Sequence, residues 1–197
     1  MILKKLFERP AAQPVQPAAP RQDLASLTIA DARVGDNISA SGAGDNFADL
    51  DFTVDHSSRY EAGERQWFDV SGHYGGRRVT IEVHSDDDEL DVRGYLDGRK
   101  LTLEDLGLSE DDLAQIDERQ NTADNFNFED KNWYYRFSRE IGVFHDDAPQ
   151  GAGYYGWEFI EETGQRYLAI RKREGEPFSA SVAVKLNPGD ITVYRPA

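Results

Sequence analysis

Apolar residues recur with a period of two along most of this chain, and this alternation constrains the fold more than any other feature. Val79, Ile81 and Val83, for example, alternate with polar residues over the segment 78–84. Because successive side chains of a strand point to opposite faces, this pattern predicts strands with one buried and one polar face. The predicted strands are 51–56, 66–74, 77–84, 90–96, 132–137, 154–161, 166–172 and 178–184.

Short turn signals separate these strands and predict their direction. Gly75-Gly76 and Asp97-Gly98 supply residues that readily adopt the positive φ angles of tight hairpin turns. Short turns join antiparallel neighbours, whereas parallel strands need long crossovers. The predicted fold is therefore mainly β (α+β), with antiparallel β-sheets or barrel-like halves.

One central helix is predicted near 104–120, with its regular part at 110–119. Ser109 and Asp112 have the spacing of a capping box, in which each side chain satisfies a free backbone N–H of the other residue. Leu113 and Ile116 then form a narrow apolar stripe.

The two sides of this helix resemble each other loosely. Trp67 and Trp157 each begin a hairpin whose second strand starts with an arginine just after the turn. This pattern predicts two related β halves, 27–103 and 121–197. The alternative is that two hairpins share their chemistry by coincidence.

Residues 1–22 differ from the acidic body, 23–197. They are rich in proline and alanine and carry a charge of +3. Because the whole chain has a net charge of −15, the body carries −18. Such a segment predicts a flexible tail. Its first nine residues are either a frayed start or a short amphipathic helix that makes weak peripheral contact with a membrane or a partner. No transmembrane segment is predicted, and an acidic body disfavours nucleic acid as a partner.

The sequence lacks the recognisable constellations of catalysis and cofactor binding. There is no cysteine, which excludes thiolate chemistry. The four histidines lack the spacing of a helical zinc site, and no phosphate-binding loop is present. We predict no catalytic residue, no cofactor and no dedicated metal site. The acidic run Asp86, Asp87, Asp88 and Glu89 is a weak candidate for calcium or magnesium, but it lacks the EF-hand pattern.

Two aromatic-rich strands are the candidate ligand-binding region. Trp133 and Tyr135 share one face of the first strand, and Tyr155 and Trp157 share one face of the second. Such faces form either a core wall or a groove for a peptide, a sugar or a cationic ligand.

Several segments together resemble the bacterial domain-of-unknown-function family 4178 (DUF4178). The resemblance spans about 27–196 and rests on 29–36, 51–54, 67–70, 155–159, 166–171, 178–182 and 188–191. It is a pattern of strands and turns, so no residue role carries over. Genes of the family tend to lie near those of phage-shock-type coiled-coil proteins and small membrane proteins. The resemblance therefore implies an accessory role in envelope stress.

These observations lead to two hypotheses of different classes. The first is a non-enzymatic cytoplasmic interaction module whose acidic body engages a basic or membrane-proximal protein. The second is a small-molecule, cation or polyamine binder, or an enzyme, with an aromatic-lined site. A deep pocket with converging polar groups would favour the second hypothesis.

Overall fold

The protein is mainly β, as the alternation predicts. The structure, a computed structural model, describes residues 27–86, 89–146 and 148–196, so the predicted tail lies outside the described residues. The strands are β1 (Asn37–Ala40), β2 (Leu50–Thr53), β3 (His56–Ala62), β4 (Arg65–Tyr74), β5 (Arg77–Asp86), β6 (Glu89–Tyr95), β7 (Asn125–Phe128), β8 (Lys131–His145), β9 (Ala152–Glu161), β10 (Arg166–Lys172), β11 (Ser179–Leu186) and β12 (Ile191–Tyr194). The described residues also hold the α-helix α1 (Glu110–Arg119) and the 3-10 turns η2 (Ile29–Asp31), η3 (Asp45–Phe47) and η4 (Pro188–Asp190).

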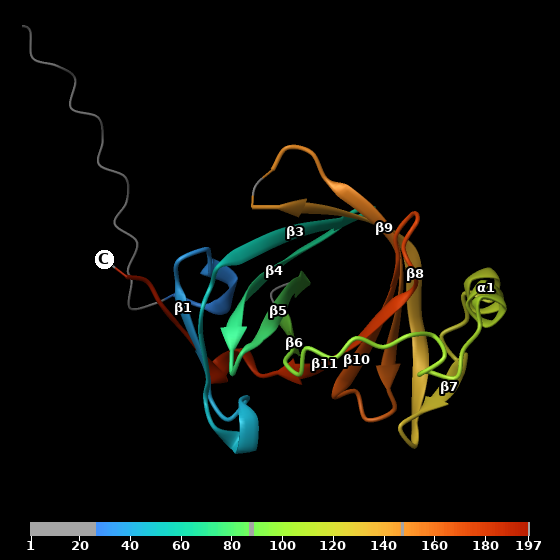
Figure 1. Ribbon diagram of the computed structural model, residues 1–197, viewed down its shortest axis with the longest axis horizontal. Coiled ribbons are helices and arrows are strands. Elements are labelled where there is room, and N and C mark those ends of the chain that lie inside the picture. The colour runs from blue at the N-terminus through green and yellow to red at the C-terminus, as the bar shows by residue number, and fades with distance from the viewer. Residues whose placement is uncertain (1–26, 87–88, 147, 197) are drawn as a thin grey trace, which may run out of the picture.

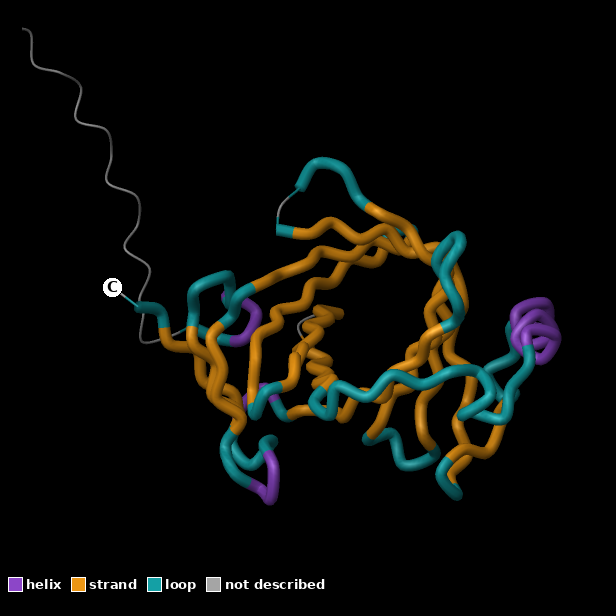
Figure 2. Tube along the Cα trace, in the orientation of Figure 1, coloured by secondary structure: helices purple, strands orange, loops and turns teal. Residues whose placement is uncertain are grey.

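Eight of these strands close into an antiparallel barrel. The hydrogen-bonded order is β3-β4-β5-β6-β11-β10-β9-β8, and a further pairing of β3 with β8 closes the ring. Ser58 lies opposite His145 and Tyr60 opposite Val143 at this seam. Figure 1 and Figure 2 show the ring of strands viewed close to the barrel axis.

The barrel has an approximate twofold layout. Strands β3–β6 form one antiparallel meander and β8–β11 form another, and the meanders join first strand to first and last strand to last. Trp67 and Trp157 lie on corresponding strands, β4 and β9, and both are buried. The two side chains lie on opposite faces of the barrel wall. Trp67 clusters with Tyr60 and Ile141, whereas Trp157 clusters with residues that α1 covers. The relationship of the two halves stays a prediction.

A three-stranded sheet, β12-β1-β2, covers the outside of one meander, and we call it the small sheet. Its Ile38, Leu50 and Val193 pack against Ile81 and Val92 of the barrel in one buried apolar cluster. Gly72 lies where β2 crosses β4, and a Cβ atom there would overlap the Thr53 carbonyl oxygen. A glycine is therefore needed for this close approach.

The helix and the segment before it cover the other meander. Leu113 and Ile116 of α1 pack with Leu101, Leu106 and several residues of β8–β11 in a second buried cluster. The predicted capping box is present, since Ser109 and Asp112 bond each other's backbone N–H groups. The predicted helix is confirmed, although 104–107 form turns and the helix begins only at Glu110.

Three differences from the predicted strands have physical causes. The predicted strand 51–56 is two strands, because the chain leaves the small sheet after Thr53 and enters the barrel at His56. Strand β8 continues to His145, well past the predicted end at 137, and a bulge between Tyr135 and Phe137 keeps it in register with β9. The short strands β1, β7 and β12 carry too few residues for alternation to reveal them.

Candidate functional site

The barrel interior holds a polar network beside a small hydrophobic cluster that includes Tyr60, Trp67 and Ile141, while the outside of the same strands is apolar. On β5, Val79, Ile81 and Val83 belong to the cluster under the small sheet. Because side chains alternate along a strand, Glu82 and His84 point the other way, into the barrel. The polar face that the alternation predicts is thus enclosed rather than exposed.

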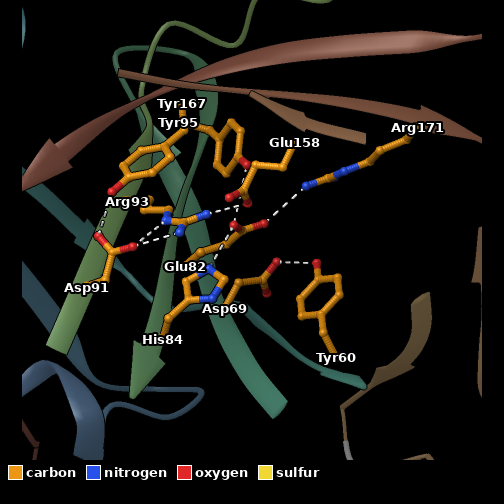
Figure 3. A network of polar contacts seen from close by, with 10 residues as sticks. All are labelled: Tyr60, Asp69, Glu82, His84, Asp91, Arg93, Tyr95, Glu158, Tyr167 and Arg171. Atoms are coloured by element: carbon orange, nitrogen blue, oxygen red, sulfur yellow. Dashed lines mark hydrogen bonds and ion pairs between the residues drawn. The ribbon is translucent and has the colours of Figure 1, made fainter. Parts of the chain in front are cut away.

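Arg93 of β6 organises the first part of the interior network (Figure 3). Its guanidinium donates to Asp91 at 2.8 Å and to Glu158, on the opposite meander, at 2.5 Å. The ring of Tyr167 lies 3.8 Å from the guanidinium carbon. Burial alone would lower the pKa of Arg93, but the charges of Glu158 and Asp91 outweigh it and raise that pKa. Arg93 is therefore a fixed positive charge.

Arg171 of β10 forms the second part of the network. It donates to Glu82 at 3.0 Å and lies 5.6 Å from the ring centre of Tyr95. Glu82 also accepts from Tyr95 at 3.3 Å and contacts His84 Nε2 at 3.4 Å. Burial alone would raise the pKa of Glu82, but His84, Arg171 and Arg93 hold it below the ordinary value. Glu82 is accordingly ionised at neutral pH.

Asp69 of β4 is a further buried acid in the interior. It accepts a hydrogen bond of 2.6 Å from Tyr60. Burial raises the pKa of Asp69 to about 6, even though the hydrogen bonds from Tyr60 and Ser58 act in the opposite direction. Asp69 therefore changes charge near pH 6.

Trp67 lies between two other rings on neighbouring strands. Its ring centre is 5.3 Å from that of Tyr60 and 5.2 Å from that of His84, with nearly parallel planes. The indole N–H is buried and has no hydrogen-bond partner. Trp67, Glu82 and His84 line an inner cavity of about 20 Å³, which is room for about one water molecule.

A larger cavity opens at one end of the barrel, and we call it the mouth cavity. Its volume is about 230 Å³. It is lined by Asp69, Arg77, Arg78, Thr80, Tyr95, Asp97, Gly98, Arg99, Lys100, Arg171 and Ser181. Tyr95 and Arg171 line both cavities, so these two side chains stand between the mouth and the interior.

The mouth cavity is basic, although the chain as a whole has a net charge of −15. All four of its arginines have acidic partners: Arg171 pairs with Glu82, and Arg77, Arg78 and Arg99 pair with Asp45, Asp55 and Glu129. Lys100 has no acidic partner among the described residues. Burial, together with the charges of Arg171 and Arg173, lowers the pKa of Lys100.

The four aromatic residues predicted to bind a ligand lie on the outer face of β8 and β9. Trp133, Tyr135 and Trp157 are buried in the cluster that α1 covers, and Tyr155 packs against it. The Tyr155 hydroxyl donates to Asp117 of α1 at 2.9 Å. The structure brings these residues together as a wall for the helix. Trp157 is also among the residues that line the inner cavity, while none of the four residues lines the mouth cavity.

Two of the predicted acidic cation candidates, Asp86 and Glu89, lie at the ends of β5 and β6. Asp86 is opposite Glu89 in the strand register, while Asp87 and Asp88 lie outside the described residues. Within the described ranges, no group of three or more His, Asp or Glu residues is placed to share a metal ion.

The sequence interpretation missed the interior residues Asp69, Glu82, Arg93, Glu158 and Arg171. Asp69, Glu82 and Glu158 each stand between two apolar or aromatic neighbours on a predicted strand, and Arg93 and Arg171 each follow an apolar residue. Alternation is the signal that could have drawn attention to them. It cannot distinguish a face exposed to water from a face enclosed in a barrel.

Comparison with protein-family models, with curated proteins and with solved structures found no match to this chain. Among the residues that the structure describes, no helix has the length and apolar character needed to span a membrane.

Proposed function

We propose that this protein binds a small anionic molecule in the mouth cavity of its barrel. The observation that carries the proposal is the gathering of basic side chains around one cavity of an acidic chain. The mouth of a β-barrel is a common place for a ligand site. An eight-stranded barrel leaves room inside for side chains or for one small ligand.

Lys100 is the cation of the cavity with the greatest capacity for a new partner, because it has no acidic partner among the described residues. Arg171 pairs with Glu82, and its charge also acts on Lys100. A carboxylate or phosphate group placed between Lys100 and Arg171 would gain charge-assisted hydrogen bonds. The hydroxyl groups of Thr80, Tyr95 and Ser181 line the same cavity and would orient the rest of the ligand.

The cavity volume limits the size of the ligand. About 230 Å³ is below the roughly 300–1,000 Å³ of sites that take drug-sized molecules. A small metabolite with one or two acidic groups suits this space better than a lipid or a peptide. We propose ligand binding as the role of this cavity, because the arginines, the lysine and the hydroxyl groups that line it all supply binding contacts.

The test measures the melting temperature of the full chain with citrate, inorganic phosphate or spermidine, each at the same ionic strength. We expect citrate or phosphate to raise it and spermidine to leave it unchanged. The Lys100→Gln variant should lose most of the shift. Lys185→Gln is the matched control, because Lys185 lies on β11 near its far end, opposite Arg93, and outside the cavity. Stabilisation by spermidine alone would support a cation or polyamine binder instead.

An interaction module remains the second candidate function, and one observation favours it. The large apolar side chains that are exposed among the described residues are Val34, Phe47 and Tyr194, and all belong to the small sheet or its adjoining loops. Phe47 is 92% exposed. Large apolar side chains left exposed on one sheet and its loops are candidate positions for a protein contact.

In this second candidate, the partner is a basic or membrane-proximal protein, the compartment is the cytoplasm and the role is accessory to envelope stress. The resemblance to DUF4178 supports it by analogy alone. A pull-down from the native host compares the full chain, a chain without residues 1–22, and the Phe47→Ser variant. Loss of one specific protein with Phe47→Ser would support the small sheet as the contact. Equal recovery by all three would argue against both contacts.

A further inference from the structure

Two histidines that are far apart in the sequence meet at the seam that closes the barrel. His56 begins β3 and His145 ends β8. His56 Nε2 lies 3.4 Å from His145 Nδ1, and the two ring centres are 5.3 Å apart. The seam pairs Ser58 with His145, so the strand register itself brings the imidazoles together.

We propose that His56 and His145 form a binding site for a divalent transition-metal ion such as Zn²⁺. In this site, His56 Nε2 and His145 Nδ1 are the two protein ligands, and the ion replaces the proton that the imidazoles otherwise share. The site is separate from the mouth cavity, whose lining does not include either histidine.

The separation of the two nitrogens is the main argument for an ion. Zinc binds histidine nitrogen at about 2.0–2.1 Å in tetrahedral geometry, which places two such nitrogens about 3.3–3.4 Å apart. The observed 3.4 Å matches this spacing. The rings need to rotate, but the nitrogens do not need to separate.

A carboxylate contacts the far ring nitrogen of one of the two proposed ligands. His56 Nδ1 is 2.7 Å from Asp146 Oδ2, and the other oxygen of Asp146 accepts from the Ser57 backbone N–H at 3.1 Å. A carboxylate that accepts from the far nitrogen of a metal-binding histidine fixes its tautomer and its orientation. Asp146 would thus leave the lone pair of His56 Nε2 directed at the ion.

The surroundings of the two histidines determine how an ion reaches them and which of its coordination positions stay open. The His56 side chain is 36% exposed, so an ion reaches it from solvent. Ser58 Oγ lies 3.0 Å from His145 Nδ1 and is the nearest further oxygen that the structure places on this nitrogen. With two imidazole ligands, the remaining positions fall to water or a small anion. Histidine nitrogens favour zinc, copper or nickel over magnesium or calcium.

The test is calorimetric titration of the full chain with zinc chloride, with magnesium chloride as the comparison ion. We expect one zinc per chain and no heat from magnesium beyond dilution. His56→Ala and His145→Ala should each weaken zinc binding at least about tenfold, and Asp146→Asn about 10- to 100-fold. His73→Ala is the matched control, because His73 is also a surface histidine next to an acid, Asp55, and it should bind zinc as the unchanged chain does.

Long-range ¹H–¹⁵N spectra of the imidazoles provide the second measurement. Zinc should shift His56 Nε2 and His145 Nδ1 and leave the ring nitrogens of His73 in place. If an alanine variant fails to fold by circular dichroism, His56→Gln and His145→Gln replace it. Zinc binding that survives in both histidine variants, or the absence of zinc binding by the unchanged chain, would overturn the proposal and leave a hydrogen-bonded imidazole pair.

Discussion

On β5, Val79, Ile81 and Val83 pack outward beneath the small sheet, whereas Glu82 and His84 point into the barrel and join a charged network. The same contrast holds on β9, where Trp157 and Phe159 face the helix cover and Glu158 reaches Arg93 inside. The two faces of one barrel wall thus contribute different interactions to the fold. The outer face supplies apolar burial, and the inner face holds charges whose positions depend on one another.

This contrast explains why the barrel needs its covers. An apolar outer face exposed to water would be unstable, and burial of about 25 cal/mol per Å² of apolar surface drives the small sheet and α1 onto it. The inner face gains less from burial, because desolvation of each charge opposes the attraction within each ion pair. The outer face therefore contributes mainly apolar burial, and the inner face adds a network of paired charges to its smaller hydrophobic cluster.

The largest expected effect comes from breaking the inner network. Arg93→Met leaves Glu158 and Asp91 without their cation and should lower the free energy of unfolding by roughly 3–5 kcal/mol. Replacing all three residues together with apolar ones should recover most of this loss. Urea unfolding measures both. A single variant as stable as the unchanged chain would show that the interior is hydrated and not a closed network.

Variants of the two tryptophans compare the inner and outer faces of the barrel directly. Trp67→Ala on the inner face and Trp157→Ala on the outer face should each cost roughly 3–5 kcal/mol, because each deletes a large buried aromatic side chain. Denaturant unfolding followed by circular dichroism gives the two values. Little loss with Trp67→Ala alone would mean that the inner ring belongs to a ligand site and contributes little to the core.

Asp69 makes the inner face sensitive to pH. Its pKa is about 6 in the folded protein against 3.8 for the free side chain, so the folded state binds this proton more tightly. Its contribution to stability is greatest below pH 3.8 and is lost as pH rises through about 6. By linkage, the loss is on the order of 3 kcal/mol.

The Asp69→Asn variant isolates this effect, because asparagine resembles the protonated acid and does not titrate. Unfolding at several pH values should show the unchanged chain losing stability relative to Asp69→Asn between about pH 4 and 6. Parallel pH profiles for the two proteins would contradict the shifted pKa of Asp69.

The smallest effect is expected where α1 meets the outer face. Tyr155→Phe removes the hydrogen bond to Asp117 and should cost roughly 1–2 kcal/mol. Since Tyr155 faces the helix, the same variant should leave anion binding at the mouth cavity unchanged. Loss of ligand binding with little change in stability would instead restore Tyr155 as a ligand-binding residue.

The sequence by itself determined the local structure. Alternation and glycine turns predicted most of the strands and their antiparallel pairing, and the Ser109–Asp112 capping box predicted α1. These are interactions between residues close in the chain, whose spacing appears directly in the sequence. The polar character of one face of each strand was determined in the same way.

Only the tertiary structure decided which face is enclosed and which residues meet. Alternation makes the two faces of β5 different, but the pairing of β3 with β8 makes the polar face the interior. The same closure places His56 beside His145 and Arg93 beside Glu158. Such contacts depend on the register of strands that are distant in the chain, and register is set by the packing of the whole barrel, which no local pattern encodes.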